Sequence, residues 1–250
     1  MATAAEPLTT HVGLLGHPVA NSLSPRMQNA AFAARGLDWH YSAHDVEDAL
    51  AAVASLCELG YAGANVTIPH KQAVVAACDE AEGEAVNTLV FRGGRVLGFN
   101  TDKEILAGIG ARRACLIGSG GAARTLAPAL PADTRVFTRS GDWPPDATGC
   151  DLVINATPVR DDVLVELHAG QTVVDLAYGN EETALVEAAR AAGCEVVDGL
   201  EALVRQGAAS FRLWTGLEPP VDVMRSAVRT GTTQRPTRPA RAAGPGRSRT

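Results

Sequence analysis

The sequence lacks any long hydrophobic run. Its apolar stretches are short, such as residues 114–118, whereas a membrane-spanning helix needs about 20 apolar residues. The first residues also lack the basic start and apolar block of a secretory signal. Hydrophobic residues make up 46% of the 250 residues and charged residues 20%, values ordinary for a globular protein. We therefore expect a soluble, cytoplasmic protein with no membrane partner.

Paired cysteines are also missing. The five cysteines are dispersed, and none belongs to a C-x-x-C motif. They are Cys57, Cys78, Cys115, Cys150 and Cys194. The histidines likewise show no metal-ligand spacing. We therefore predict free thiols in a reducing compartment, with no disulfide framework and no metal site.

Lysine is nearly absent, because 20 of the 22 basic residues are arginines. The two lysines, Lys71 and Lys103, both lie in polar segments of the first half. The formal net charge is −6, yet the chain from Arg225 onward holds seven arginines and no acid. Residues 230–250 are rich in Pro, Gly, Ser and Arg, which predicts a disordered basic tail. Because its arginines are spread out, we expect no nucleic-acid partner.

Short β-rich runs alternate with alanine-rich helical stretches, which predicts an α/β fold with parallel strands. Expected strands include 11–16, 114–118 and 172–178, and expected helices include 24–36, 119–130 and 199–216. Pro69 is placed to begin another helix over 69–78. We predict two α/β domains, residues 8–104 and 105–204. The C-terminal helices within 205–229 are expected to pack back on the first domain.

A glycine-rich turn follows the buried strand 114–118. Its residues are Gly118, Ser119, Gly120, Gly121 and Ala122, and a helix is expected to begin within it. Such a turn lets a pyrophosphate approach the backbone and meet free N–H groups at the helix start. A glycine-rich turn alone is a weak signal, but its position between a strand and a helix favours a Rossmann-type dinucleotide site.

The next expected strand ends in Thr138, Arg139 and Ser140. NAD enzymes carry an acidic residue at this point to hold the ribose 2′-hydroxyl. An arginine there can instead pair with a 2′-phosphate. The sequence thus favours NADP over NAD, although Arg139 could also be a solvated side chain at the end of the strand.

Polar residues at strand ends of the first half form a candidate site. Ser22 and Ser24 suit a carboxylate at a helix start, or they could simply cap that helix. Lys71 and Asp102 are a candidate acid–base pair, the alternative for Lys71 being a surface charge. Polar side chains in otherwise apolar runs, suited to a polyhydroxy ligand or to loop capping, are Asn65, Thr67, Asn87 and Asn100.

Taken together, the motifs resemble those of the shikimate dehydrogenase family over residues 11–229. They occur in the order GHPVANSLSP, GANVTIPHK, AVNT, NTD, GSGGAAR, NATP and DGLEALVRQGAASFRLWTG. The resemblance implies an N-terminal substrate domain and a Rossmann-type cofactor domain with a cleft between them. It also implies reversible NADPH-dependent reduction of 3-dehydroshikimate to shikimate, by a monomer or homodimer.

The resemblance also implies roles for individual residues. Lys71 would be the catalytic acid–base, with Asp102 beside it. Substrate contacts would come from Ser22, Ser24, Asn65, Thr67, Asn87, Tyr178 and Gln206. The pyrophosphate would lie on residues 118–122 and the ribose phosphate on 138–140. Leu176 and Gly199 would lie against the nicotinamide end.

Several positions depart from the family pattern. Glu84 and Ile105 stand where glycines are usual, and the stretch from 105 to 114 is short. The loop after NATP reads V-R-D-D, and a basic residue expected shortly after Ser140 is absent. These departures leave two alternatives open: a paralogue acting on quinate or an aminoshikimate, and a nucleotide-binding sensor with weak catalysis.

Overall fold

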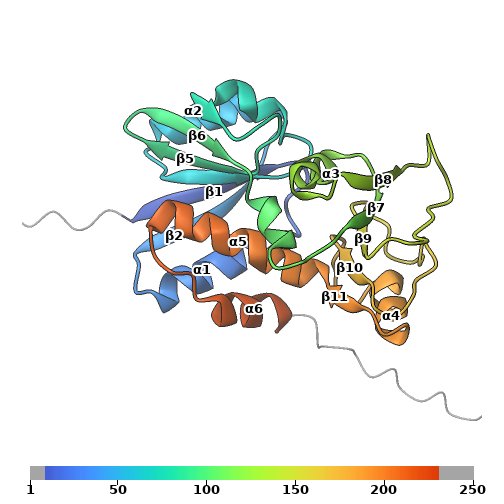
Figure 1. Cartoon of the computed structure of the whole chain (residues 1–250). Helices are drawn as coiled ribbons and strands as arrows, with labels where there is room; N and C mark the ends of the chain where they lie inside the picture. Colours follow the sequence, from blue (N-terminus) through green and yellow to red (C-terminus); the bar gives the residue numbers. More distant parts are fainter. Residues whose placement is uncertain (1–8, 231–250) are drawn as a thin grey trace, which may run out of the picture.

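Two β-sheets organise residues 9–230, the part of the chain that this computed structural model describes (Figure 1). The predicted disordered tail lies outside the described residues, apart from Thr230. Within the described part, no helix is long and apolar enough to cross a membrane. The α/β fold class predicted from the sequence is confirmed.

The first sheet has six strands in the order β2-β1-β3-β5-β6-β4. Their bounds are β1 Thr10–Gly16, β2 Trp39–Asp45, β3 Gly63–Val66, β4 Glu80–Ala81, β5 Thr88–Arg92 and β6 Arg95–Phe99. β1 is parallel to β2 and β3, whereas β5 is antiparallel to both β3 and β6. Helices α1 (Ser24–Ala34) and α2 (Ala49–Glu58) connect the first three strands and lie on opposite faces (Figure 1).

The second sheet has five strands, all parallel, in the order β11-β10-β9-β7-β8. They are β7 Arg113–Ile117, β8 Asp133–Phe137, β9 Leu152–Asn155, β10 Thr172–Asp175 and β11 Glu195–Val197. The three middle strands are apolar and almost wholly buried, as expected of parallel strands covered on both faces. Helices α3 (Gly121–Leu126) and α4 (Ala184–Ala191) accompany this sheet.

Helix α5 (Gly199–Thr215) joins the two halves and is followed by α6 (Val221–Arg229). Near its start, Ala202 packs in a hydrophobic cluster with second-sheet residues such as Ile154. Further along, Phe211 and Trp214 pack against Val12 of β1 in a different cluster. Helices α5 and α6 therefore both contribute residues to a cluster that contains residues of the first sheet. The exact division of the chain into domains stays a prediction.

The prediction of a helix over residues 69–78 is wrong. Only a short 3₁₀ helix, η1 (Ala73–Ala77), forms there. The backbone carbonyl of Lys71 accepts the N–H of Val86 at 2.9 Å, a partner distant in sequence, in place of an amide one helical turn ahead. The expected helix after the glycine-rich turn is also shorter, because α3 ends at Leu126 and a 3₁₀ turn containing Pro128 follows.

Gly63 is fixed by the way Trp214 packs on the first sheet. The indole Nε1 of Trp214 donates to the carbonyl of Leu89 at 2.9 Å. A Cβ at Gly63 would lie 2.2 Å from that carbonyl oxygen and 2.5 Å from the indole nitrogen. We expect Gly63→Ala to destabilise the protein by about 2 kcal/mol or more, measured by denaturant unfolding. Gly110→Ala is the matched control, because a Cβ there meets no atom within 4 Å; equal stability of both variants would contradict the account.

Candidate active site

A cavity of ≈ 870 Å³ lies where β1, β3 and β10 reach their carboxyl ends. Every residue expected to bind substrate or move a proton lines it. From the first half these are Ser22, Ser24, Asn65, Thr67, Lys71, Asn87 and Asp102, and from the second half Tyr178 and Gln206. Ala122, Leu176 and Gly199, expected to contact the cofactor, line the same cavity. The fold thus brings segments that are distant in sequence together around one cavity.

Lys71 and Asp102 form a buried ion pair at the wall of this cavity. The ammonium Nζ of Lys71 lies 2.5 Å from Oδ2 of Asp102, and the side chains are only 11% and 8% exposed. The other carboxylate oxygen, Oδ1, accepts a hydrogen bond from Nδ2 of Asn87 at 2.7 Å. Burying two charges is costly unless they are paired and hydrogen-bonded, and this pair meets both conditions. The surface-charge alternative for Lys71 is therefore ruled out by its burial.

Asn87 and Asn100 hold Asp102 in place. Asp102 lies in the 3₁₀ helix η2 (Thr101–Leu106), and its backbone N–H donates to Asn100 Oδ1, which caps that helix. The Oδ1 of Asn87 accepts the backbone N–H of Thr101 at 2.8 Å, while its Nδ2 donates to Asp102. One N–H of the Asn87 amide is left for a ligand, since an amide nitrogen carries two.

Asn65 is largely engaged with protein. Its Nδ2 lies within hydrogen-bond distance of the Asn87 carbonyl, Thr88 Oγ1 and Ser210 Oγ. These acceptors take both of its N–H groups. Its Oδ1 accepts the hydroxyl of Tyr41 at 2.8 Å. Only the second lone pair of Oδ1 is left for a ligand hydroxyl, so the amide of Asn65 chiefly shapes the cavity wall.

Four hydroxyl groups lie together near the start of α1. Ser22 interacts with the hydroxyl of Tyr178, and Ser24 interacts with the hydroxyl of Tyr41. Burial raises the pKa of both tyrosines above the ordinary value of 10, and the serine contacts only partly offset that rise. At neutral pH all four groups are uncharged. The hydroxyl of Tyr41 donates to Asn65 and lies outside the cavity lining, so Ser22, Ser24 and Tyr178 are the hydroxyl groups of this cluster that line the cavity. Such a cluster suits a carboxylate.

The glycine-rich turn has the shape that a dinucleotide needs. Gly118 has φ +111°, a conformation that favours glycine, and a Cβ there would lie 3.1 Å from the Ala156 carbonyl. Gly120 faces open space. Gly121 faces the side chain of Lys71, because a Cβ on it would lie 3.9 Å from Cδ of Lys71. Ser119 is exposed beside Gly120. The turn therefore leaves backbone accessible to phosphates close to the cavity.

Thr138, Arg139 and Ser140 follow β8, at the edge of the second sheet and outside the cavity lining. The guanidinium of Arg139 lies 5.4 Å from the ring centre of Trp143, which is partly exposed. This stacked pair presents a cation and an aromatic face beside the same edge as the glycine-rich turn. Sequence reasoning did not single out Trp143.

Arg160 is a second residue that sequence reasoning missed, and it lines the cavity. It comes from the V-R-D-D loop after β9, where the family pattern was seen to change. Its Nη2 donates to the carbonyl of Glu181 at 2.9 Å, and its guanidinium fills the space beside Gly179. The departure from the motif was the signal that could have pointed to it. Ile105, another departure, also lines the cavity and packs in the core.

Asp175 anchors the loop that carries Leu176 and Tyr178. Its carboxylate accepts hydrogen bonds from Thr183 Oγ1, from Asn155 Nδ2 at 2.9 Å and from the N–H of Ala177 at 3.0 Å. Burial raises the pKa of Asp175, while these hydrogen bonds act in the opposite direction. This carboxylate is fully buried, so we assign it to holding the loop rather than to chemistry.

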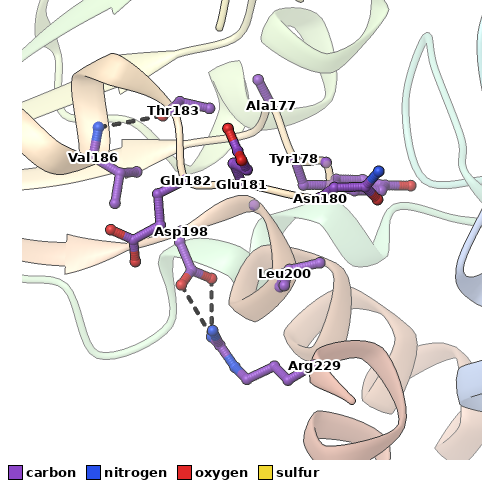
Figure 2. A pocket seen from close by; sticks show the side chains of 12 residues that line it. Ala177, Tyr178, Asn180, Glu181, Glu182, Thr183, Val186, Asp198, Leu200 and Arg229 are labelled. Carbon is purple, nitrogen blue, oxygen red and sulfur yellow. Dashed lines mark hydrogen bonds and ion pairs between the residues drawn. The ribbon is translucent and has the colours of Figure 1, made fainter. Parts of the chain in front are cut away.

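A smaller hollow of ≈ 330 Å³ adjoins the cavity and shares Tyr178, Gly179, Asn180 and Gly199 with it. Figure 2 shows Asp198 and Arg229 paired at its edge, at 3.0 Å, and the cap from Thr183 to the N–H of Val186. Tyr178 and Asn180 point away from these charged groups in that view. The Asp198–Arg229 pair ties the start of α5 to the end of α6.

Among residues 9–230, no group of three His, Cys, Asp or Glu side chains lies close enough together to hold a metal ion. The five cysteines are all free.

Comparison with known proteins gives consistent matches. The family model described as the shikimate dehydrogenase substrate binding domain matches residues 14–89, and the shikimate 5′-dehydrogenase C-terminal domain matches residues 199–229. A shikimate dehydrogenase (NADP(+)) from Methanopyrus kandleri is 37% identical over 275 residues. That match covers 88% of this chain and 95% of the relative.

Solved structures match over nearly the whole chain. Shikimate 5-dehydrogenase from Thermus thermophilus in complex with NADP(H) and shikimate gives a TM-score of 0.78 at 32% identity, covering 89% of this chain and 99% of that one. Quinate dehydrogenase from Corynebacterium glutamicum in complex with NAD gives a TM-score of 0.76 at 28% identity, with the same coverage of both chains.

The raised pKa values of Tyr41 and Tyr178 predict a defined response to alkaline pH. Because each folded pKa lies above the unfolded value of about 10, their contribution to stability is present below that pH and is lost as pH rises through the folded values. Spectrophotometric titration of the three tyrosines should show two late-ionising groups, one of which disappears in Tyr178→Phe. Ionisation of all three near pH 10 in the folded protein would contradict the assignment.

Proposed function

The chain belongs to the shikimate dehydrogenase family, and we propose that it catalyses the reversible reduction of 3-dehydroshikimate to shikimate with NADPH. The resemblance inferred from the motifs is confirmed by these relatives. The observation that carries the proposal is the buried Lys71–Asp102 pair on the wall of a cavity that the glycine-rich turn also reaches. NADP-dependent relatives support NADP as the cofactor.

When bound, NADPH supplies the hydride to the ring carbonyl carbon. As negative charge develops on the carbonyl oxygen, the ammonium of Lys71 donates a proton to it. Asp102 orients that ammonium through the 2.5 Å contact. Such a proton donor contributes about 10²–10⁴-fold to rate. In the reverse direction, Lys71 accepts the proton from the shikimate hydroxyl.

The remaining lining residues would orient the ring. We propose that the hydroxyls of Ser22, Ser24 and Tyr178 bind the substrate carboxylate. The free N–H of Asn87, with Thr67 and Gln206, would contact ring hydroxyls. Asn65 would contribute one lone pair at most. Residues 118–122 would hold the pyrophosphate and Thr138–Ser140 the ribose phosphate, with Leu176 and Gly199 against the nicotinamide.

Quinate dehydrogenation with NAD is a second candidate, favoured by the similarity to the quinate dehydrogenase structure. Comparing kcat/KM on shikimate and quinate, each with NADP and NAD, separates the two. Cofactor binding without turnover on either substrate would favour the sensor alternative. A cytoplasmic location and a monomer or homodimer stay predictions from the sequence.

Lys71→Ala should lower kcat by about 10²–10⁴-fold, because the proton donor is lost. NADP binding, measured by calorimetry, should be retained. Lys103→Ala is the matched control, since Lys103 is the other lysine and pairs with Glu82 at 3.0 Å on the surface. Activity of Lys71→Ala within threefold of the control would remove Lys71 from the mechanism.

Arg139→Leu should weaken NADP binding by roughly 10- to 100-fold, the cost of losing a hydrogen-bonded ion pair to the 2′-phosphate. NAD affinity should change far less, because NAD lacks that phosphate. Calorimetric titration with both nucleotides measures the difference. Equal changes in the two affinities would show that Arg139 acts on the adenosine and not on the phosphate.

A further inference from the structure

Thr125 contacts the catalytic pair from the side of the cofactor. It lies in α3, the helix that follows the glycine-rich turn, and its side chain is buried at 1% exposure. Its hydroxyl Oγ1 lies 2.5 Å from Oδ2 of Asp102. This is the same oxygen that the ammonium of Lys71 contacts. One carboxylate oxygen therefore meets a donor from the segment after β3 and a donor from the helix after the glycine-rich turn.

The single proton of this hydroxyl has three acceptors within reach. The carbonyls of Ala122 and Gly121 lie at 2.9 and 3.2 Å, and the carboxylate oxygen lies at 2.5 Å. A hydroxyl donates most strongly to an ionised acceptor, and hydroxyl–carboxylate hydrogen bonds have lengths of about 2.5–2.7 Å. The proton therefore belongs to the bond with Asp102.

A second hydrogen bond fixes the same residue to the same turn. The backbone carbonyl of Thr125 accepts Nδ2 of Asn100 at 2.6 Å, while Asn100 Oδ1 caps the helix that carries Asp102. Thr125 thus holds both ends of the Asn100–Asp102 turn, one through its carbonyl and one through its hydroxyl. Such a pair of bonds sets the distance and the angle between α3 and η2.

We infer that Thr125 is a positioning residue for the acid–base pair, linking the cofactor-binding turn to the orientation of Asp102. Asn87 fixes Oδ1 of the carboxylate and Thr125 fixes Oδ2, so the carboxylate plane is set from both sides. The orientation of the carboxylate in turn sets the position of the Lys71 ammonium, which contacts Oδ2. The role in catalysis rests on the proposed function, whereas the positioning of Lys71 does not.

Thr125→Val tests the catalytic consequence, because valine keeps the shape and removes the hydroxyl. We expect kcat with shikimate and NADP to fall by about 10- to 100-fold, the effect of losing a hydrogen bond to a charged group. KM for shikimate and the Kd for NADP should stay within about threefold. Thr125→Ser keeps the donor and should recover most of the lost activity.

Thr134→Val is the matched control, since it makes the same substitution at a threonine outside the cavity lining. Thr134 lies in β8, and its hydroxyl donates to the carbonyl of Pro131, away from the cavity. Its substitution should leave kcat unchanged. Wild-type kcat in Thr125→Val, or equal losses in Thr125→Val and Thr125→Ser, would overturn the inference.

The chain also offers a test that needs no substrate. Since Lys71 and Lys103 are the only lysines, selective isotope labelling of lysine gives one side-chain NMR signal from each. Thr125→Val should move the Lys71 signal and leave the Lys103 signal in place, and Thr125→Ser should restore the first. An unmoved Lys71 signal overturns the inference whatever the activity. A wild-type chain inactive on shikimate would instead overturn the proposed function, and the NMR result would still decide the role of Thr125.

Discussion

The buried ion pair between Lys71 and Asp102 is the constraint on which the site depends. Burying an ammonium and a carboxylate costs solvation free energy. That cost is offset only if the two charges pair and their remaining hydrogen-bonding positions are filled. Asn87 and Thr125 fill those positions on Asp102. Asn87 lies just before β5 of the first sheet, and Thr125 lies in α3, which accompanies the second sheet. Much of the polar network around the cavity therefore serves this one pair. The proposed catalysis would use the same hydrogen bonds that stabilise the buried pair.

The sequence predicted the strands and the members of the cavity well, because these follow from local patterns and motifs. Polar residues that follow buried strands meet at the carboxyl ends of those strands. Here Ser22 and Thr67 follow β1 and β3 of the first sheet, Tyr178 follows β10 of the second sheet, and all three line one cavity. Sequence reasoning failed where a distant contact decided the outcome. The carbonyl of Lys71 pairs with Val86 and so interrupts the helix expected after Pro69. No local pattern carries that information.

Side-chain roles were harder to predict than side-chain positions. Asn65 lies in the cavity wall as expected, yet its amide is taken up by Tyr41, Thr88 and Ser210. Ser210 lies far along the chain in α5, so only the folded structure shows that Asn65 hydrogen-bonds with it. For Thr125 and Arg160 it was the position itself that the sequence did not predict. Each stands in a segment assigned to the cofactor or to a loop, and only the fold brings Thr125 to Asp102 and Arg160 to the cavity.

Helix α5 belongs to two hydrophobic clusters at once, through Ala202 on one side and Val204 on the other. The two sheets therefore cannot separate as independent bodies without breaking one of these clusters. Between and beside these contacts, Leu203 and Gln206 of the same helix line the cavity. A substitution on this helix that loosens either cluster would therefore also displace residues of the cavity wall, so the packing of the two halves and the shape of the cavity are not independent.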